Sequence, residues 1–101
     1  MTLEEALRSV WRQALEDNLT SIEIGGEQVR VRHTSGGHLA QVDFTFEGRE
    51  LRGLQQNPKT TSRWAQLARA GKRVMQFLEG GRYIGVVVDG KVTLYGGSKR
   101  A

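Results

Sequence analysis

Residues 74–95 read VMQFLEGGRYIGVVVDGKVTLY, and this stretch decides the fold class. It contains three short runs rich in β-branched and aromatic residues, at 74–79, 82–88 and 91–95. Gly80-Gly81 and Asp89-Gly90 separate the runs, and both dipeptides favour the positive φ angles of two-residue hairpin turns. The stretch therefore predicts three antiparallel strands joined by tight turns.

Similar runs lie upstream of this stretch. Apolar and polar residues alternate strictly over 40–46, which is typical of a strand with one buried and one wet face. Two more runs, at 22–24 and 29–33, flank the turn pair Gly25-Gly26. Ser35-Gly36-Gly37 and Gly48 mark further turns, and residues 51–54 form a weaker strand.

Two segments have helical periodicity instead. Over 3–18 the apolar residues recur at spacings of three and four, and Thr2 and Glu5 have the spacing of a capping box. The second helix is expected over 62–70, after a loop containing Pro58, with Thr60, Thr61 and Ser62 as candidate N-caps. Gly71 is a suitable residue for its C-terminal end.

Together these elements predict an α+β fold. We expect an antiparallel meander sheet with two helices packed on one face, in the order α-β-β-β(-β)-α-β-β-β. One domain should cover residues 1–95, followed by a flexible basic tail at 96–101. The second half echoes the first in element order, and the question of a true repeat stays open.

The amino-acid composition indicates the cellular compartment in which the protein works. The chain of 101 residues has no cysteine, which excludes disulfides, thiolate metal sites and cysteine nucleophiles. Small secreted domains usually depend on disulfides, so we expect a cytoplasmic protein. The longest apolar run, residues 86–88, is far too short to cross a membrane, and we expect no membrane partner.

The residues that carry most enzyme chemistry form no recognisable constellation. His33 and His38 flank a predicted turn, but a zinc site needs further ligands and the chain has no other histidine. No serine lies in a nucleophile elbow, and the glycines occur as hairpin pairs, not as a phosphate-binding loop. We therefore expect no catalytic residue, no metal site and no cofactor.

Charge is the most informative feature for function. Residues 1–50 carry five Lys/Arg and nine Asp/Glu, whereas residues 51–101 carry ten Lys/Arg and two Asp/Glu. Such asymmetry favours binding of nucleic acid or another polyanion by the basic half. The candidate anion-binding residues are Arg52, Lys59, Arg63, Arg69, Lys72, Arg73 and Arg82. Tyr83 and Tyr95 are candidate stacking surfaces for bases.

Two other readings stay open. The run 82–88 places Ile84, Val86 and Val88 on one face and Tyr83, Gly85 and Val87 on the other, so both faces need a cover. A second copy of the chain could supply one cover, which predicts a structural or regulatory homo-oligomer that mediates protein–protein interaction. The remaining reading is an enzyme whose pocket converges on the two histidines and a carboxylate.

Overall fold

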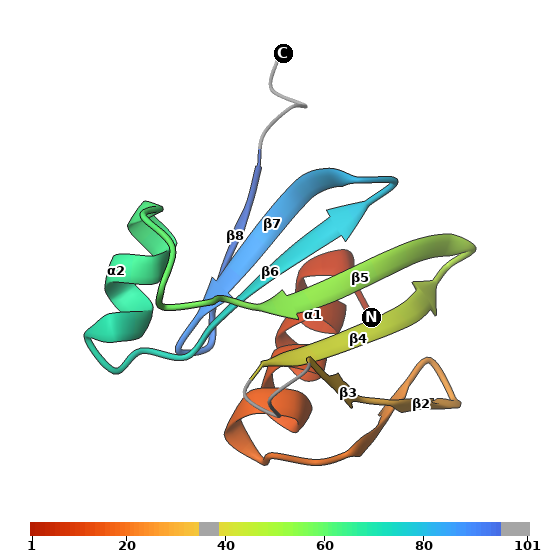
Figure 1. Cartoon of the computed structure of the whole chain (residues 1–101). Coiled ribbons are helices and arrows are strands. Elements are labelled where there is room, and N and C mark those ends of the chain that lie inside the picture. Colours follow the sequence, from red (N-terminus) through yellow and green to blue (C-terminus); the bar gives the residue numbers. More distant parts are fainter. Residues whose placement is uncertain (35–38, 96–101) are drawn as a thin grey trace.

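The computed structural model describes residues 1–34 and 39–95 (Figure 1). The N-terminal helix is α1 (Leu3–Trp11), which continues directly into the π-helical segment η1 (Arg12–Glu16). The second helix is α2 (Arg63–Arg69). The strands are β1 (Ser21–Ile24), β2 (Glu27–Arg30), β3 (Arg32–His33), β4 (Ala40–Phe46), β5 (Arg49–Gln55), β6 (Val74–Glu79), β7 (Arg82–Val88) and β8 (Lys91–Leu94).

The start of α1 is fixed by the capping box that the sequence predicts. The Thr2 side chain accepts a hydrogen bond from the backbone N–H of Glu5 at 3.1 Å, and the Glu5 carboxylate accepts one from the backbone N–H of Thr2 at 2.8 Å. This reciprocal pairing satisfies backbone donors that would otherwise have no partner within the helix. It also lowers the pKa of the Glu5 carboxyl, because the Thr2 backbone hydrogen bond favours the charged form.

Six strands form one antiparallel meander in the order β3-β4-β5-β6-β7-β8, and β1 and β2 form a separate hairpin. Residues 27–33 are shared between the two sheets: β2 pairs with β1, and β3 pairs with β4. Between them the backbone N–H of Val31 donates to the carbonyl of Thr20 at 2.9 Å. The extended stretch that the sequence predicts as one strand is therefore divided into two.

One face of the six-stranded sheet, here called the inner face, packs against α1 and η1. Its buried residues belong to a single cluster that includes Leu7 and Val10 of the helix and Phe44, Phe77 and Val87 of the sheet. The rings of Phe44 and Phe77 meet edge to face with centroids 6.1 Å apart. In Figure 1, α1 lies behind β4 and β5, on this inner side of the sheet.

Gly53 of β5 shows how tightly the inner face is packed. A Cβ atom at this position would lie 3.0 Å from the Met75 sulfur and 3.0 Å from the Phe77 ring. Side chains in a native core have no room for an additional carbon at such distances. Glycine at position 53 therefore leaves room for the Met75 and Phe77 side chains of β6 to pack against β5.

The second helix packs on the opposite, outer face. The only buried residue of α2 is Ala65, and it lies outside the inner cluster, as do the buried Val74 and Val86. Those two valines alternate along β6 and β7 with Met75 and Val87, which point to the inner face, so they point to the outer one. The prediction that both helices pack on one face is wrong, because α2 contacts β6 and lies on the outer face of the sheet, at one end of β6 and β7.

The remaining predictions for the fold are largely confirmed. The α+β class, the antiparallel meander and the alternation of helices and strands are as expected, and the structure adds one strand by dividing residues 27–33. The weak strand predicted at 51–54 is a seven-residue strand, β5, that pairs on both sides. Both positions of the 25–26, 80–81 and 89–90 turns have positive φ. The predicted turn at 35–37 and the tail at 96–101 lie outside the described residues.

Candidate functional site

The structure separates the seven candidate cations into several groups. Residues 51–78 contain six of them and no acidic residue at all. That stretch passes from β5 through the loop and α2 into β6, so its cations are spread over the sheet and both sides of the helix. Only the cations that no carboxylate neutralises can attract an anionic partner strongly.

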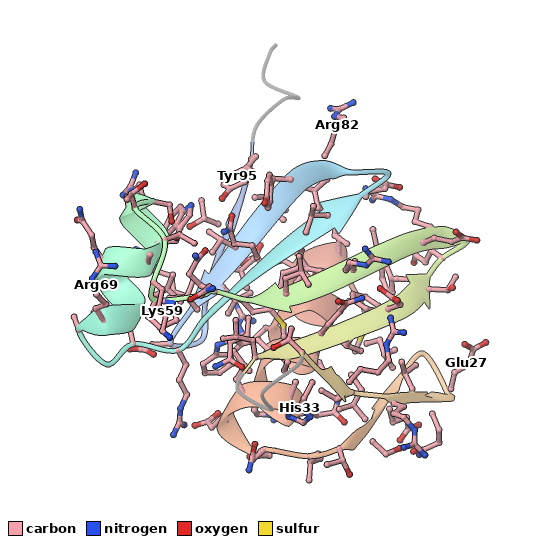
Figure 2. All side chains as sticks on the ribbon, viewed as in Figure 1. Glu27, His33, Lys59, Arg69, Arg82 and Tyr95 are labelled. Carbon is pink, nitrogen blue, oxygen red and sulfur yellow. The ribbon has the colours of Figure 1, made fainter. Side chains whose placement is uncertain are left out.

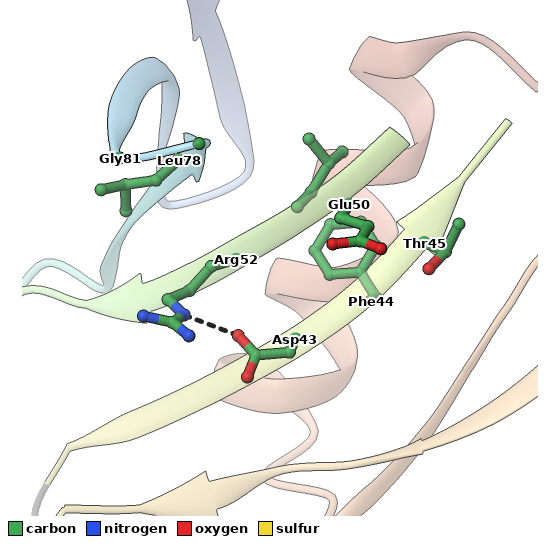
Figure 3. A pocket seen from close by; sticks show the side chains of 9 residues that line it. Asp43, Phe44, Thr45, Glu50, Arg52, Leu78 and Gly81 are labelled. Carbon is green, nitrogen blue, oxygen red and sulfur yellow. Dashed lines mark hydrogen bonds and ion pairs between the residues drawn. The ribbon is translucent and has the colours of Figure 1, made fainter. Parts of the chain in front are cut away.

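Arg52 is neutralised on the outer face. Its Nε donates to Asp43 Oδ1 at 2.7 Å (Figure 3). Asp43 Oδ2 accepts from Arg32 at 2.7 Å. The hydrogen bond with Asp43 raises the pKa of the Arg52 guanidinium. These groups border a shallow hollow of about 450 Å³ that Glu50 also lines. With two carboxylates in or beside it, this hollow does not suit an anion.

Lys72 and Arg73 lie in the turn after α2, and neither side chain adds to the positive charge on the exposed side of the helix. The Lys72 ammonium is 3.7 Å from a carboxylate oxygen of Asp89. The Arg73 backbone accepts the indole N–H of Trp11 at 3.0 Å, and its side chain borders a small hollow of about 170 Å³ together with His33 and Gln55. Arg73 therefore faces the α1 side of the molecule.

The cations without a carboxylate partner in the described structure include Lys59, Arg63 and Arg69, here called the α2 basic surface. All three side chains are exposed. The loop beneath them is held by short-range hydrogen bonds: Asn57 Oδ1 accepts from the Lys59 backbone N–H at 2.8 Å, and Ser62 caps α2 by accepting from Ala65 at 3.1 Å. These hydrogen bonds hold the backbone on both sides of the residues that carry the charges.

Arg69 also has a structural role in this surface. Its Nη1 donates to the carbonyl of Thr60 at 3.0 Å and to the carbonyl of Pro58. These contacts join the last turn of α2 to the loop that precedes the helix. Because carbonyls are neutral acceptors, the positive charge of Arg69 remains uncompensated.

Arg82 lies apart from these cations, at the start of β7. It borders a hollow of about 670 Å³, here called the tyrosine hollow, which is lined by Leu3, Arg49, Glu79, Arg82, Tyr83, Ile84, Leu94 and Tyr95. Figure 2 shows Lys59 and Arg69 beside α2, Arg82 projecting away from the sheet above β7, and Tyr95 between them in this view.

An ion pair occupies one wall of the tyrosine hollow. Arg49 binds Glu79 through two hydrogen bonds, Nε to Oε2 at 3.0 Å and Nη2 to Oε1 at 2.7 Å. This pairing lowers the pKa of the Glu79 carboxyl and raises that of Arg49. Because Arg49 and Glu79 cancel each other, Arg82 leaves the hollow with one uncompensated positive charge.

Tyr83 reaches this place through a β-bulge that the sequence pattern did not reveal. Phe77 pairs with Gly85 and the next residue, Leu78, pairs with Tyr83, so Ile84 is an extra residue in β7. Directly paired residues lie on the same face of a sheet, so Tyr83 points to the outer face with Leu78. The prediction that Tyr83 shares a face with Gly85 and Val87 is wrong for this reason. An irregularity that inserts one residue is invisible to a strict alternation of residue types.

The described part of the chain shows no metal-binding cluster at His33. His38 lies outside the described residues, and His33 borders only the small hollow beside Arg73. Within residues 1–34 and 39–95, no three side chains of the metal-binding types come together. None of the described helices is long and apolar enough to span a membrane.

Comparison of the chain with protein-family models, with curated proteins and with solved structures finds no match.

Proposed function

We propose that this protein is a non-catalytic cytoplasmic module that binds a polyanion, above all nucleic acid, through the α2 basic surface and Arg82. The observation that carries this proposal is the absence of any carboxylate partner for Lys59, Arg63 and Arg69 among the described residues. When exposed cations of this kind neutralise phosphates, the counterions condensed on the nucleic acid are released, which favours binding at low salt.

The proposal is narrower than the set of residues that the sequence suggests. Arg52 and Lys72 are paired with Asp43 and Asp89, so they contribute less to the attraction of an anion. Arg73 lies on the side of His33. The remaining residues, Lys59, Arg63, Arg69 and Arg82, are those we assign to the binding surface.

Charge reversal tests this assignment. Lys59→Glu combined with Arg63→Glu should lower the affinity for a fluorescein-labelled oligonucleotide at least about tenfold at low salt and reduce the salt slope by roughly 1.4 to 1.8. Among the described residues neither side chain makes a hydrogen bond that holds the loop, so the fold should survive. Fluorescence anisotropy over a range of salt concentrations measures both quantities.

The matched control is Arg12→Glu combined with Arg30→Glu, on η1 and β2; the only carboxylate near either guanidinium in the described structure is that of Asp17, 4.0 Å from Arg12. It reverses two exposed cations of the acidic first half, remote in sequence from α2. Equal loss of affinity in both double variants would show only a response to net charge and would contradict the assigned surface. An affinity of the unmodified protein that ignores salt would remove the proposal altogether.

Self-association is the second candidate function, and one observation favours it. Strand β8 is one of the two edge strands of the six-stranded sheet, and in the described residues it pairs with β7 alone. Leu94 at its end is 42% exposed, although large apolar side chains usually find cover. We infer that a homodimer would form by antiparallel pairing of β8 with its copy. Light scattering that shows a monomer at micromolar concentration would contradict this second candidate.

A further inference from the structure

Four polar-aromatic and cationic side chains form a continuous series between α2 and Arg82. The Arg63 guanidinium carbon lies 4.7 Å from the centroid of the Trp64 ring. Trp64, Arg63 and Tyr83 all lie close enough to Tyr95 to affect the pKa of its phenol, and Tyr95 and Tyr83 border the same hollow. The series therefore runs from a cation on α2 over three aromatic rings to Arg82 on β7.

The tyrosine hollow has the character of a site for a flat, partly apolar group. Leu3, Ile84 and Leu94 line it on the inner side of the sheet, and Tyr83 and Tyr95, which point to the outer face, border it at the end of the sheet where β7 begins and β8 ends. The Tyr83 side chain is 52% exposed, which is unusual for an aromatic residue. No hydrogen bond in the described structure holds this side chain in place. A volume of about 670 Å³ leaves room for a nucleobase with its sugar.

The direction of Tyr83 results from the bulge at Ile84. Without that extra residue, Tyr83 would follow Gly85 and Val87 to the inner face. Bulges of this kind are frequent next to binding sites, because they turn one side chain away from the regular alternation. The bulge thus brings Tyr83 to the side of the sheet that carries Tyr95 and α2.

Burial raises the pKa of the Tyr95 phenol, while the hydrogen bond with Trp64 and the charge of Arg63 act in the opposite direction and Tyr83 raises it further. Tyr95 is therefore a neutral phenol at physiological pH. A neutral ring presents an uncharged stacking surface close to two cations, which is the combination found in proteins that hold single strands.

We propose, building on the polyanion-binding function above, that the ligand is single-stranded nucleic acid. Unpaired bases stack on Tyr83 and Tyr95 at the outer edge of the tyrosine hollow, while Arg63 and Arg82 neutralise phosphates on either side of the two rings. In a duplex the faces of the bases are covered by their neighbours and cannot enter a hollow of this kind. The chain should therefore prefer a single strand over the same strand in a duplex.

The test compares one labelled strand in two states. The probe is fluorescein-labelled oligo(dT) of about 12 nucleotides, a length that matches the site size of small single-strand binders. It is titrated alone and after annealing to oligo(dA) of the same length, and oligo(U) serves as the RNA counterpart. We expect tighter binding to the free strand.

Tyr83→Ala and Tyr83→Phe form the matched pair of variants. Removal of one stacking ring should weaken binding of free oligo(dT) by about 5- to 100-fold without changing the salt slope, because no charge is lost. Tyr83→Phe retains the ring and should bind like the unmodified protein. Since Tyr83 is exposed, both variants should fold, and circular dichroism with a thermal melt checks this.

Failures of the two proposals can be told apart. If neither form of the probe binds at low salt, the polyanion-binding function itself is wrong. If duplex and free strand bind equally and Tyr83→Ala changes nothing, the function stands but the single-strand inference is overturned. Light scattering could instead show that Tyr83→Ala dissociates a dimer while nucleic-acid binding stays unchanged. The tyrosine hollow would then be part of an interface with a second copy of the chain, which also overturns the inference.

Discussion

On the inner face of the six-stranded sheet, side chains from β4 to β7 enter one apolar cluster beneath α1. On the outer face the same strands carry paired charges, glutamines and an exposed tyrosine, and α2 covers only one end. The helices differ in the same way: α1 buries Ala6, Leu7 and Val10, whereas α2 buries only Ala65. Because most buried apolar side chains lie on the inner face, we expect stability to come mainly from that face and binding to use the outer one.

The neighbours Phe77 and Leu78 test that division most strongly, because they point to opposite faces of one strand. Phe77 is fully buried against Phe44, so Phe77→Ala should lower the free energy of unfolding by about 3–5 kcal/mol. Leu78 is only half-buried, and Leu78→Ala should cost about 1 kcal/mol. Urea denaturation followed by circular dichroism measures both. Similar losses for the two variants would show that the outer face contributes as much as the inner one.

Much of this division could be predicted from the sequence, because it depends on local periodicity. The strands, the turns at Gly80-Gly81 and Asp89-Gly90, and the Thr2 capping box all follow from residue spacing. The side of the sheet on which α2 packs could not be predicted, because the loop before it permits either direction. The bulge at Ile84 was equally hidden, since one inserted residue alters the facing of Tyr83 without altering composition.

The candidate site was predictable only in part, for a related reason. The sequence identifies cations but not their partners, so Arg52 could not be distinguished from Arg63. Asp43 lies nine residues before Arg52 and meets it only because β4 and β5 pair in a register that places the two side by side. The stretch 51–78, with no acidic residue, was the signal that did point to α2.

The two tryptophans provide the next test of the comparison. Trp11 is 6% exposed, and its indole N–H donates to the carbonyl of Arg73 at 3.0 Å. Trp11→Phe leaves that carbonyl without its donor and should lower the free energy of unfolding by about 1–2 kcal/mol. Trp64→Phe, on the half-buried side of α2, should cost less than about 1 kcal/mol. A larger loss from Trp64→Phe would mean that α2 is part of the main core.

Acid should weaken the protein through two carboxylates at one end of the molecule. The pKa of Glu79 is lowered by its hydrogen bonds with Arg49, and that of Glu5 by its hydrogen bond with Thr2. A lowered pKa in the folded state stabilises the protein above the unfolded value of 4.5, and this contribution is lost as the pH falls through the folded value. Thermal midpoints should therefore fall below about pH 4.5.

Glu79→Gln separates this effect from general acid sensitivity. The variant should be slightly less stable than the unmodified protein at neutral pH and should lose less on acidification, because one titrating group is gone. Glu16→Gln, on the exposed end of η1, is the matched control, since no salt bridge in the described structure involves Glu16. Parallel acid profiles for Glu79→Gln and the unmodified protein would contradict the assigned role of the Arg49–Glu79 pair.

The smallest expected effect on stability comes from Asp43, which holds Arg32 and Arg52 on the outer face. All three side chains are about half exposed, and exposed ion pairs contribute little, so Asp43→Asn should change the free energy of unfolding by less than about 1 kcal/mol. The same change releases two guanidinium groups on the face that carries α2. If a bound strand continues from the tyrosine hollow across β5, its affinity should rise about two- to fivefold at low salt and return to the original value at high salt. An affinity that falls would contradict attraction of an anion by the outer face, because the only charge removed is a negative one.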